Sequence, residues 1–135
     1  PYANDESPVI RKWKIAPGSA DNPPASDTPW GTAYSMVDGL LPDEDLGLGE
    51  IIYAQGAVDV QVAGSVKLLL NSTKGLKLWI DDRPVNDLTV PIDLTAGRRI
   101  LTFVIQRDQR SASGLRTELT TPNGSPAKYQ LLGGL

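Results

Sequence analysis

The stretch Asn71-Ser-Thr-Lys-Gly-Leu-Lys-Leu-Trp-Ile-Asp-Asp-Arg-Pro-Val85 decides the fold class of this chain. Its first five residues are typical of a turn, and the alternating residues 76–81 are typical of a β-strand. Residues 81–84 predict a second tight turn into a returning strand. Together with the apolar run 66–70, the stretch predicts a hairpin whose turn is residues 71–75. No part of it is a catalytic motif, so it indicates a fold and not a reaction.

The rest of the chain repeats this pattern of short strands divided by turns. Gly 13 and Pro 11 are high counts for 135 residues and imply many turns. Residues 51–62 alternate most clearly, and residues 99–107 are apolar on both faces, as in a central strand. No convincing amphipathic helix is present. We therefore expect an all-β fold, an antiparallel, jelly-roll-like β-sandwich of about eight or nine strands. The other predicted strands are residues 9–16, part of 30–41, 88–94, 115–120 and 128–132.

The length is that of one domain with its own core. Residues 1–8 are polar and bounded by proline, and they predict a linker or arm. Residues 9–132 form the predicted sandwich, and residues 133–135 a C-terminal linker. A first residue other than Met indicates a domain taken from a longer protein. Residues 17–29, rich in Pro, Ser and Asp, predict a long loop of the kind that often carries function.

Composition excludes several classes of function. The chain has no His and no Cys, so histidine-based triads, cysteine nucleophiles, zinc sites and conventional haem ligation are excluded. We expect a protein that is not an enzyme and that has no cofactor. The net charge of -3 and scattered basic residues argue against nucleic-acid binding. No apolar run approaches the length of a membrane span, so we expect no membrane insertion.

Four pieces in order along the second half of the chain carry a family resemblance. They are Gly64-Ser-Val-Lys-Leu-Leu-Leu-Asn-Ser72, Gly75-Leu-Lys-Leu-Trp-Ile-Asp81, Leu94-Thr-Ala-Gly97 and Ser113-Gly-Leu-Arg-Thr-Glu-Leu119. Their order and spacing resemble the PA14-like and galactose-binding-like β-sandwich modules. The resemblance implies sugar binding, which in that family depends on calcium held by paired acidic residues just before the hairpin glycine. Thr73 and Lys74 stand at that position here, so calcium affinity is not carried over.

The first third of the chain has a second, looser resemblance. Arg11-Lys-Trp-Lys-Ile15 and Trp30 are similar to sandwich modules attached to large secreted bacterial multidomain proteins, including cytochrome-c-like and sugar-dehydrogenase-like ones. This resemblance implies an extracytoplasmic location, periplasmic or secreted. It also implies that any haem belongs to a neighbouring domain.

Tryptophans are the candidate ligand contacts. On a flat strand Trp79 shares a face with Lys77 and Asp81, and an indole beside polar groups suits a sugar if that face meets solvent. The alternative, which the residue type favours, is that Trp79 packs between the sheets or under a loop. Trp30, at the base of the long loop, either lines a binding site or plugs the open end of the sandwich. Trp13 is expected to be core or edge cover.

Acidic turns offer a weaker candidate for a metal site. Asp81 and Asp82 have the oxygen ligands to hold a hard cation with Asp87 or Asp93. The alternative is that these residues serve the turn itself, because Asp side chains accept hydrogen bonds from backbone N–H groups in turns. We therefore expect no metal site.

Two functions remain from the sequence. The leading hypothesis is a non-catalytic carbohydrate-binding accessory module of a larger extracytoplasmic bacterial protein, independent of calcium at the family position. Its contacts would be Trp79, Trp30, Lys77 and Asp81. The alternative is a protein-interaction or spacer domain that docks a neighbouring domain of the same polypeptide.

Overall fold

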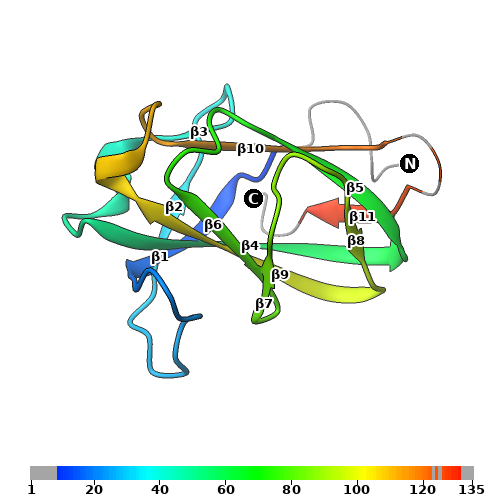
Figure 1. The fold of residues 1–135 in the computed structure, drawn as a ribbon, viewed down its shortest axis with the longest axis horizontal. Coiled ribbons are helices and arrows are strands. Elements are labelled where there is room, and N and C mark those ends of the chain that lie inside the picture. Colours follow the sequence, from blue (N-terminus) through cyan, green and yellow to red (C-terminus); the bar gives the residue numbers. More distant parts are fainter. Residues whose placement is uncertain (1–8, 123, 125, 132–135) are drawn as a thin grey trace.

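The chain forms a β-sandwich of two antiparallel sheets packed face to face, which confirms the predicted fold class (Figure 1). The computed structural model describes residues 9–122, 124 and 126–131. The predicted linkers 1–8 and 133–135, and the last residue of the predicted strand 128–132, lie outside this described part. The jelly-roll connection pattern stays a prediction.

The larger sheet carries most of the paired backbone. In spatial order its main path is β2 (Gly31–Tyr34), β1 (Lys12–Pro17), β4 (Ile51–Val62), β9 (Gly97–Gln106), β6 (Leu76–Ile80) and β7 (Arg83–Val85). β11 (Lys128–Leu131) pairs with the second half of β4, and β1 pairs with the first half. One edge of β4 is therefore shared by two strands in succession.

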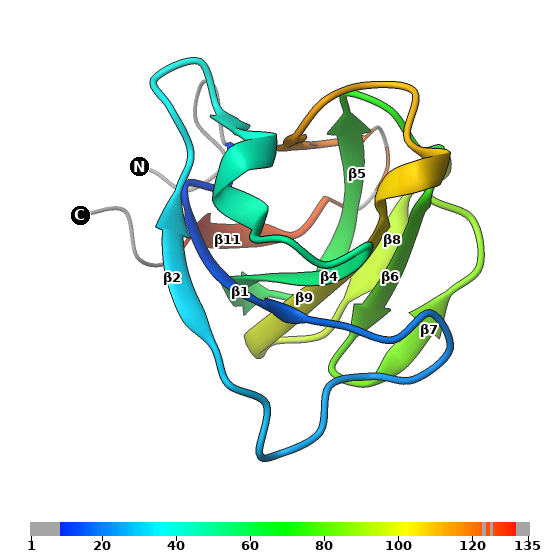
Figure 2. The same ribbon diagram turned by 90° about the vertical axis from the view of Figure 1, so that its left-hand side faces the viewer.

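The smaller sheet has four strands and lies against one face of the larger sheet (Figure 2). Its order is β3 (Leu40–Leu41), β10 (Leu115–Thr120), β5 (Gly64–Leu70) and β8 (Ile92–Leu94). Two short 3₁₀ helices, Asp43–Leu46 and Arg107–Gln109, lie in the connections. The described residues contain more strands than expected because β2, β3 and β7 are too short to show alternation in sequence.

The predicted hairpin across residues 71–75 is wrong, because β5 and β6 belong to different sheets. β5 pairs with β10 and β8, whereas β6 pairs with β9 and β7. Residues 71–75 are therefore a connection that passes from the smaller sheet to the larger one. A turn sequence of this kind serves a hairpin and a crossover equally well, so the local pattern did not distinguish them.

Arg110 holds this crossover in place. Its guanidinium donates to the carbonyl oxygens of Ser72 at 2.9 Å and Lys74 at 2.7 Å, and to that of Gly114 at 3.0 Å. Burial of the guanidinium lowers the pKa of Arg110. The Ser72 and Lys74 carbonyls lie in a connection between strands, and one side chain supplies hydrogen-bond donors to both.

The second predicted turn is confirmed as the two-residue turn of the β6–β7 hairpin. Ile80 pairs with Arg83, and the two residues between them, Asp81 and Asp82, have φ values of 49° and 70°. Positive φ at both central positions is the geometry of a type I′ turn, which Asp tolerates better than most residues.

Trp13 lies in the core between the sheets, which is one of the two positions predicted for it. It is fully buried, and its ring packs against Phe103 with centroids 6.1 Å apart. Its indole N–H donates to the Ser35 hydroxyl at 2.9 Å, which in turn donates to the Ile10 carbonyl at 2.8 Å. The central part of β9, residues 101–105, is buried on both faces as predicted.

Gly75 is the position of the crossover least able to accept a side chain. Its φ is +71°, and a Cβ there would lie 2.8 Å from the Gln106 carbonyl oxygen and 3.0 Å from the Gln109 carbonyl carbon. Both neighbours are backbone atoms and cannot swing aside. We expect Gly75→Ala to lower the free energy of unfolding by about 2 kcal/mol or more, measured by urea denaturation.

Gly31→Ala is the matched control. Gly31 is exposed at the start of β2, and the nearest atom to a Cβ there is 3.8 Å away. It should change the unfolding free energy by no more than about 0.5 kcal/mol. Equal effects of the two substitutions would contradict the role given to Gly75.

Candidate functional site

The outer face of the larger sheet, the side turned away from the smaller sheet, gathers polar side chains from four strands. Because Trp13 points into the core, the alternation of a strand directs its neighbours Lys12 and Lys14 outward. The register places Lys14 opposite Gln55, Gln55 opposite Thr102, and Thr102 opposite Trp79. We call Lys14, Gln55, Thr102 and Trp79 the central row.

Trp79 does not pack between the two sheets. It lies on the outer face with Thr102 on one side and Pro84 on the other, and it is half-buried. Its Nε1 is buried and has no acceptor within the described part of the chain. The part of Trp79 that water reaches therefore lies away from its N–H, which leaves carbon atoms of the ring as its contact surface.

Hydrogen bonding fixes the middle of the central row. The side-chain amide of Gln55 donates from Nε2 to the Thr102 hydroxyl at 2.9 Å. This bond satisfies Thr102, which is only 4% exposed. It also orients the Gln55 amide, so that the row presents a positioned amide between an indole and an ammonium.

The predicted long loop covers one end of the outer face. It starts after β1 and projects from the larger sheet on the side away from β5 and β10 (Figure 2). The Tyr53 hydroxyl donates to the Asn22 carbonyl at 2.6 Å, and Lys77 Nζ donates to the Ala20 carbonyl at 3.1 Å. Lys77 also forms an ion pair with Asp21 at 3.4 Å. The loop is therefore tied to β4 and β6 and forms a wall beside the central row.

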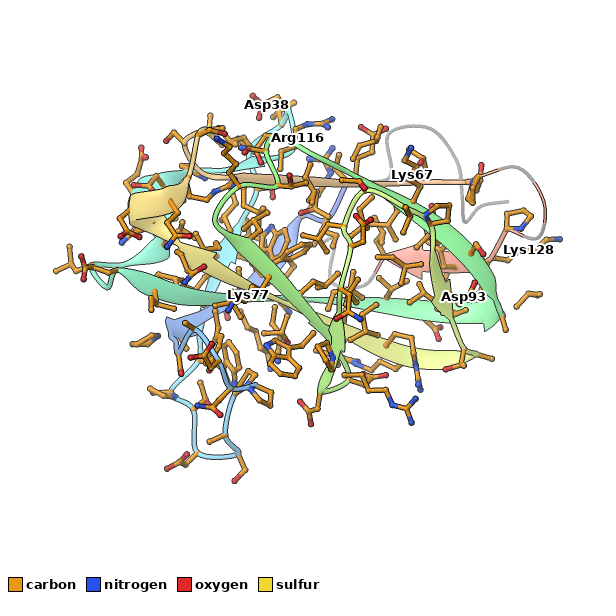
Figure 3. All side chains as sticks on the ribbon, viewed as in Figure 1. Asp38, Lys67, Lys77, Asp93, Arg116 and Lys128 are labelled. Atoms are coloured by element: carbon orange, nitrogen blue, oxygen red, sulfur yellow. The ribbon has the colours of Figure 1, made fainter. Side chains whose placement is uncertain are left out.

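Trp30 belongs to the same wall. It is half-buried, and its ring lies 6.2 Å from the ring of Tyr53 at an angle of 43°. Trp30 and Lys77 thus lie at the same end of the outer face although they are far apart in sequence, and Trp79 lies in the neighbouring row. Lys77, seen at the level of the larger sheet in Figure 3, contacts the loop, and its side chain stays 49% exposed.

Asp81 is placed apart from these three residues. Its carboxylate accepts the Ile100 N–H at 2.9 Å and pairs with Arg99 at 3.0 Å. It lines a second hollow of about 530 Å³ between the edge strands β7 and β8, together with Arg83 and Asp93. These two bonds attach the β6–β7 turn to β9. The carboxylate of Asp81 therefore has a structural role in the turn, as the alternative to a metal site predicted.

The acidic residues near this turn do not gather into a cluster. Asp87 accepts hydrogen bonds from the hydroxyl and the N–H of Thr89, at 2.6 and 2.9 Å, and these bonds lower its pKa. Within residues 9–122, 124 and 126–131, no group of three or more His, Cys, Asp or Glu side chains is placed to hold a metal ion.

A hollow of about 350 Å³ opens on the outer face next to the central row, and the sequence did not predict it as a site. Its lining is Lys12, Trp13, Lys14, Gln55, Gly56, Ala57, Arg98 and Ile100. One signal in the sequence pointed to it: once Trp13 is assigned to the core, alternation requires Lys12 and Lys14 to face outward. Arg98 and Gln55 join them only through the pairing of distant strands.

This arrangement offers the contacts of a binding surface. An indole surface, an amide, a hydroxyl and ammonium groups lie on one face of the sheet, where the strands fix their spacing. An apolar ring face beside a few directed polar groups is the common composition of a small-ligand site.

Comparison of the chain with protein-family models, with curated proteins and with solved structures gives no match. No helix among the described residues has the length and apolar character needed to cross a lipid bilayer.

The loop wall should depend on the Tyr53 hydroxyl. We expect Tyr53→Phe to keep the buried ring and lower the free energy of unfolding by only about 1 kcal/mol. Loss of the bond to Asn22 should speed amide hydrogen exchange in residues 19–29, and leave exchange in β4 and β9 unchanged. The measurement is hydrogen exchange followed by mass spectrometry.

Thr120 provides a control, because its hydroxyl donates to the Lys67 carbonyl at 3.0 Å on the other sheet. Thr120→Val should leave exchange in residues 19–29 unaltered. Unchanged exchange in that loop for Tyr53→Phe would contradict the tie between the loop and β4.

Proposed function

We propose that this domain is a non-catalytic carbohydrate-binding module that holds its ligand on the outer face of the larger sheet. The observation that carries the proposal is the position of Trp79, partly exposed on that face and in line with Thr102, Gln55 and Lys14. In this proposal the domain is a PA14-like accessory module of a larger extracytoplasmic bacterial protein. That parentage rests on the sequence resemblance.

The physical basis of the proposal is the match between this face and a sugar ring. The C–H face of a sugar stacks on an aromatic ring, while its hydroxyls need donors and acceptors at its edge. Carbon atoms of Trp79 supply the first need, and Gln55 and Lys14 supply the second. The wall formed by the loop and Trp30 would limit how far a chain of sugars extends in one direction.

Binding in this proposal does not use calcium. The family position carries Thr73 and Lys74, and an ammonium group opposes the approach of a divalent cation. A chelator should therefore leave glycan affinity unchanged.

Truncation of Trp79 is the direct test. On a glycan array and in calorimetric titration of the best glycan, we expect Trp79→Ala to weaken binding by about tenfold to hundredfold, as loss of a central aromatic contact does. Trp79→Phe should retain part of the affinity. Melting temperatures of both variants would show whether the fold is kept.

Leu69→Ala is the matched control, since Leu69 is 45% exposed on the outer side of the smaller sheet. It should leave glycan affinity unchanged. No saturable binding by the folded wild-type domain to any glycan would overturn the proposal, as would full affinity in a folded Trp79→Ala variant.

One observation favours docking of a neighbouring domain as a second candidate function. Tyr34, Met36 and Val37 are 55%, 54% and 95% exposed and lie within four residues of chain, at the end of β2 and in its connection to β3. Arg11 donates to the carbonyls of Met36 and Val37 at 3.1 and 3.4 Å and ties this segment to the chain just before β1. Exposed apolar side chains so close together are typical of an interaction surface.

For this second function, Val37→Asp should abolish association of the isolated domain with the flanking parts of its parent protein, measured by sedimentation velocity. Val90→Asp is the control, because Val90 is also exposed, at 46%, in the β7–β8 connection. Association that survives Val37→Asp would exclude this surface.

A further inference from the structure

The hollow beside the central row is lined by cations without carboxylate partners. Lys12, Lys14 and Arg98 line it, and no Asp or Glu does so among the described residues. Within the described part of the chain, these three side chains form no ion pair. The rest of the protein is acidic, with a net charge of -3, so this hollow is a local exception.

Three arginines elsewhere in the protein are used differently. Arg99, Arg107 and Arg116 each pair with a carboxylate, at 3.0, 3.4 and 2.9 Å. Arg107 also donates to the Gly49 carbonyl at 2.8 Å, so its charge serves a connection between strands. These cations have internal structural partners, whereas those of the hollow face its open volume.

The register explains why the three cations converge. Lys12 and Lys14 are two residues apart on β1, so both point to the outer face. Arg98 comes from β9, which is separated from β1 by β4 alone, a lateral distance of about 10 Å. Along the strands, Arg98 is four residues beyond Thr102 of the Lys14 row, so Arg98 and Lys14 reach the hollow from opposite ends and on opposite sides. Asp59 is the cross-strand neighbour of Arg98, yet it neither lines the hollow nor forms an ion pair with it.

The floor between these cations is apolar and small. Ala57 and Ile100 face each other across β4 and β9, and both are partly exposed. Gln55 stands at the border between this floor and Trp79. A ligand on the floor would meet hydrocarbon below it and cationic donors at its edges.

We propose that the hollow binds the anionic group of an acidic sugar, a uronic acid carboxylate or a sugar sulfate, and that the preferred ligand is an acidic polysaccharide. This inference rests on the proposed carbohydrate function and names its substrate class. Arg98 offers a planar fork of donors that matches a carboxylate or sulfate, and the two lysines add point charges. The apolar floor and Trp79 take the C–H surfaces of adjacent sugar rings.

Matched pairs of glycans test the proposal. The probes are oligogalacturonic acid with its methyl ester, and sulfated galacto-oligosaccharide with its desulfated form, titrated by calorimetry at two salt concentrations. We expect the wild-type domain to prefer a charged probe over its neutral counterpart by at least about tenfold, and to lose most of that preference in high salt. The charged probe that binds decides between carboxylate and sulfate.

Substitutions that remove positive charge test whether the preference for charged glycans comes from the hollow. Lys14→Gln should weaken binding of the charged probe by roughly threefold to tenfold, and Lys12→Gln/Lys14→Gln/Arg98→Gln should remove the preference. Lys67→Gln is the control, because Lys67 is exposed beside β10 on the other sheet (Figure 3). It removes the same charge and should leave the preference intact. Melting temperatures would show that all variants fold.

The outcomes separate the two proposals. Equal affinity for charged and neutral probes, or a preference that survives the triple substitution, overturns the anionic ligand and leaves carbohydrate binding standing. Failure of the folded wild-type domain to bind any charged or neutral glycan overturns the carbohydrate function itself, and this inference with it.

Discussion

The ladder between β4 and β9 fixes which side chains of the larger sheet face the core and which face outward. It runs without interruption from the Ile51–Gln106 pair to the Val60–Gly97 pair. Every other strand of the larger sheet attaches directly or through a neighbour to one of these two. A slip of β4 by one residue against β9 would move Ala54 out of the core and bring Gln55 into it, so burial specifies the register strongly.

The outer face follows from that register. Lys14, Gln55, Thr102 and Trp79 come from four different strands, and they form a row because their strands are paired as they are. The loop tied to Tyr53 and Lys77 closes one end of the same face. We propose sugar binding from this row. We propose an acidic sugar from the adjacent hollow, whose cations form no ion pair with any residue that the structure describes.

The sequence predicted those features that depend on local pattern. Alternation located β4 within residues 51–62 and placed Trp79 and Lys77 on one face of β6. The Asp81-Asp82 pair predicted its turn because few other residues accept positive φ. Residues 71–75 were misassigned to a hairpin, since the partner of β6 is β9, more than twenty residues further along the chain. The hollow was missed for the same reason: Arg98 and Lys12 meet only through long-range pairing.

An ¹H–¹⁵N NMR titration of the labelled domain with its tightest-binding glycan tests the central claim most directly. The chain has three tryptophans, so its indole N–H region is simple to assign. We predict shifts of the Trp79 indole signal and of the backbone amides of Lys14, Gln55 and Thr102, while the Trp13 indole in the core stays unmoved. Shifts confined to Arg83, Asp93 and Thr95 in the second hollow, with Trp79 unaffected, would contradict the assignment of the outer face as the ligand surface.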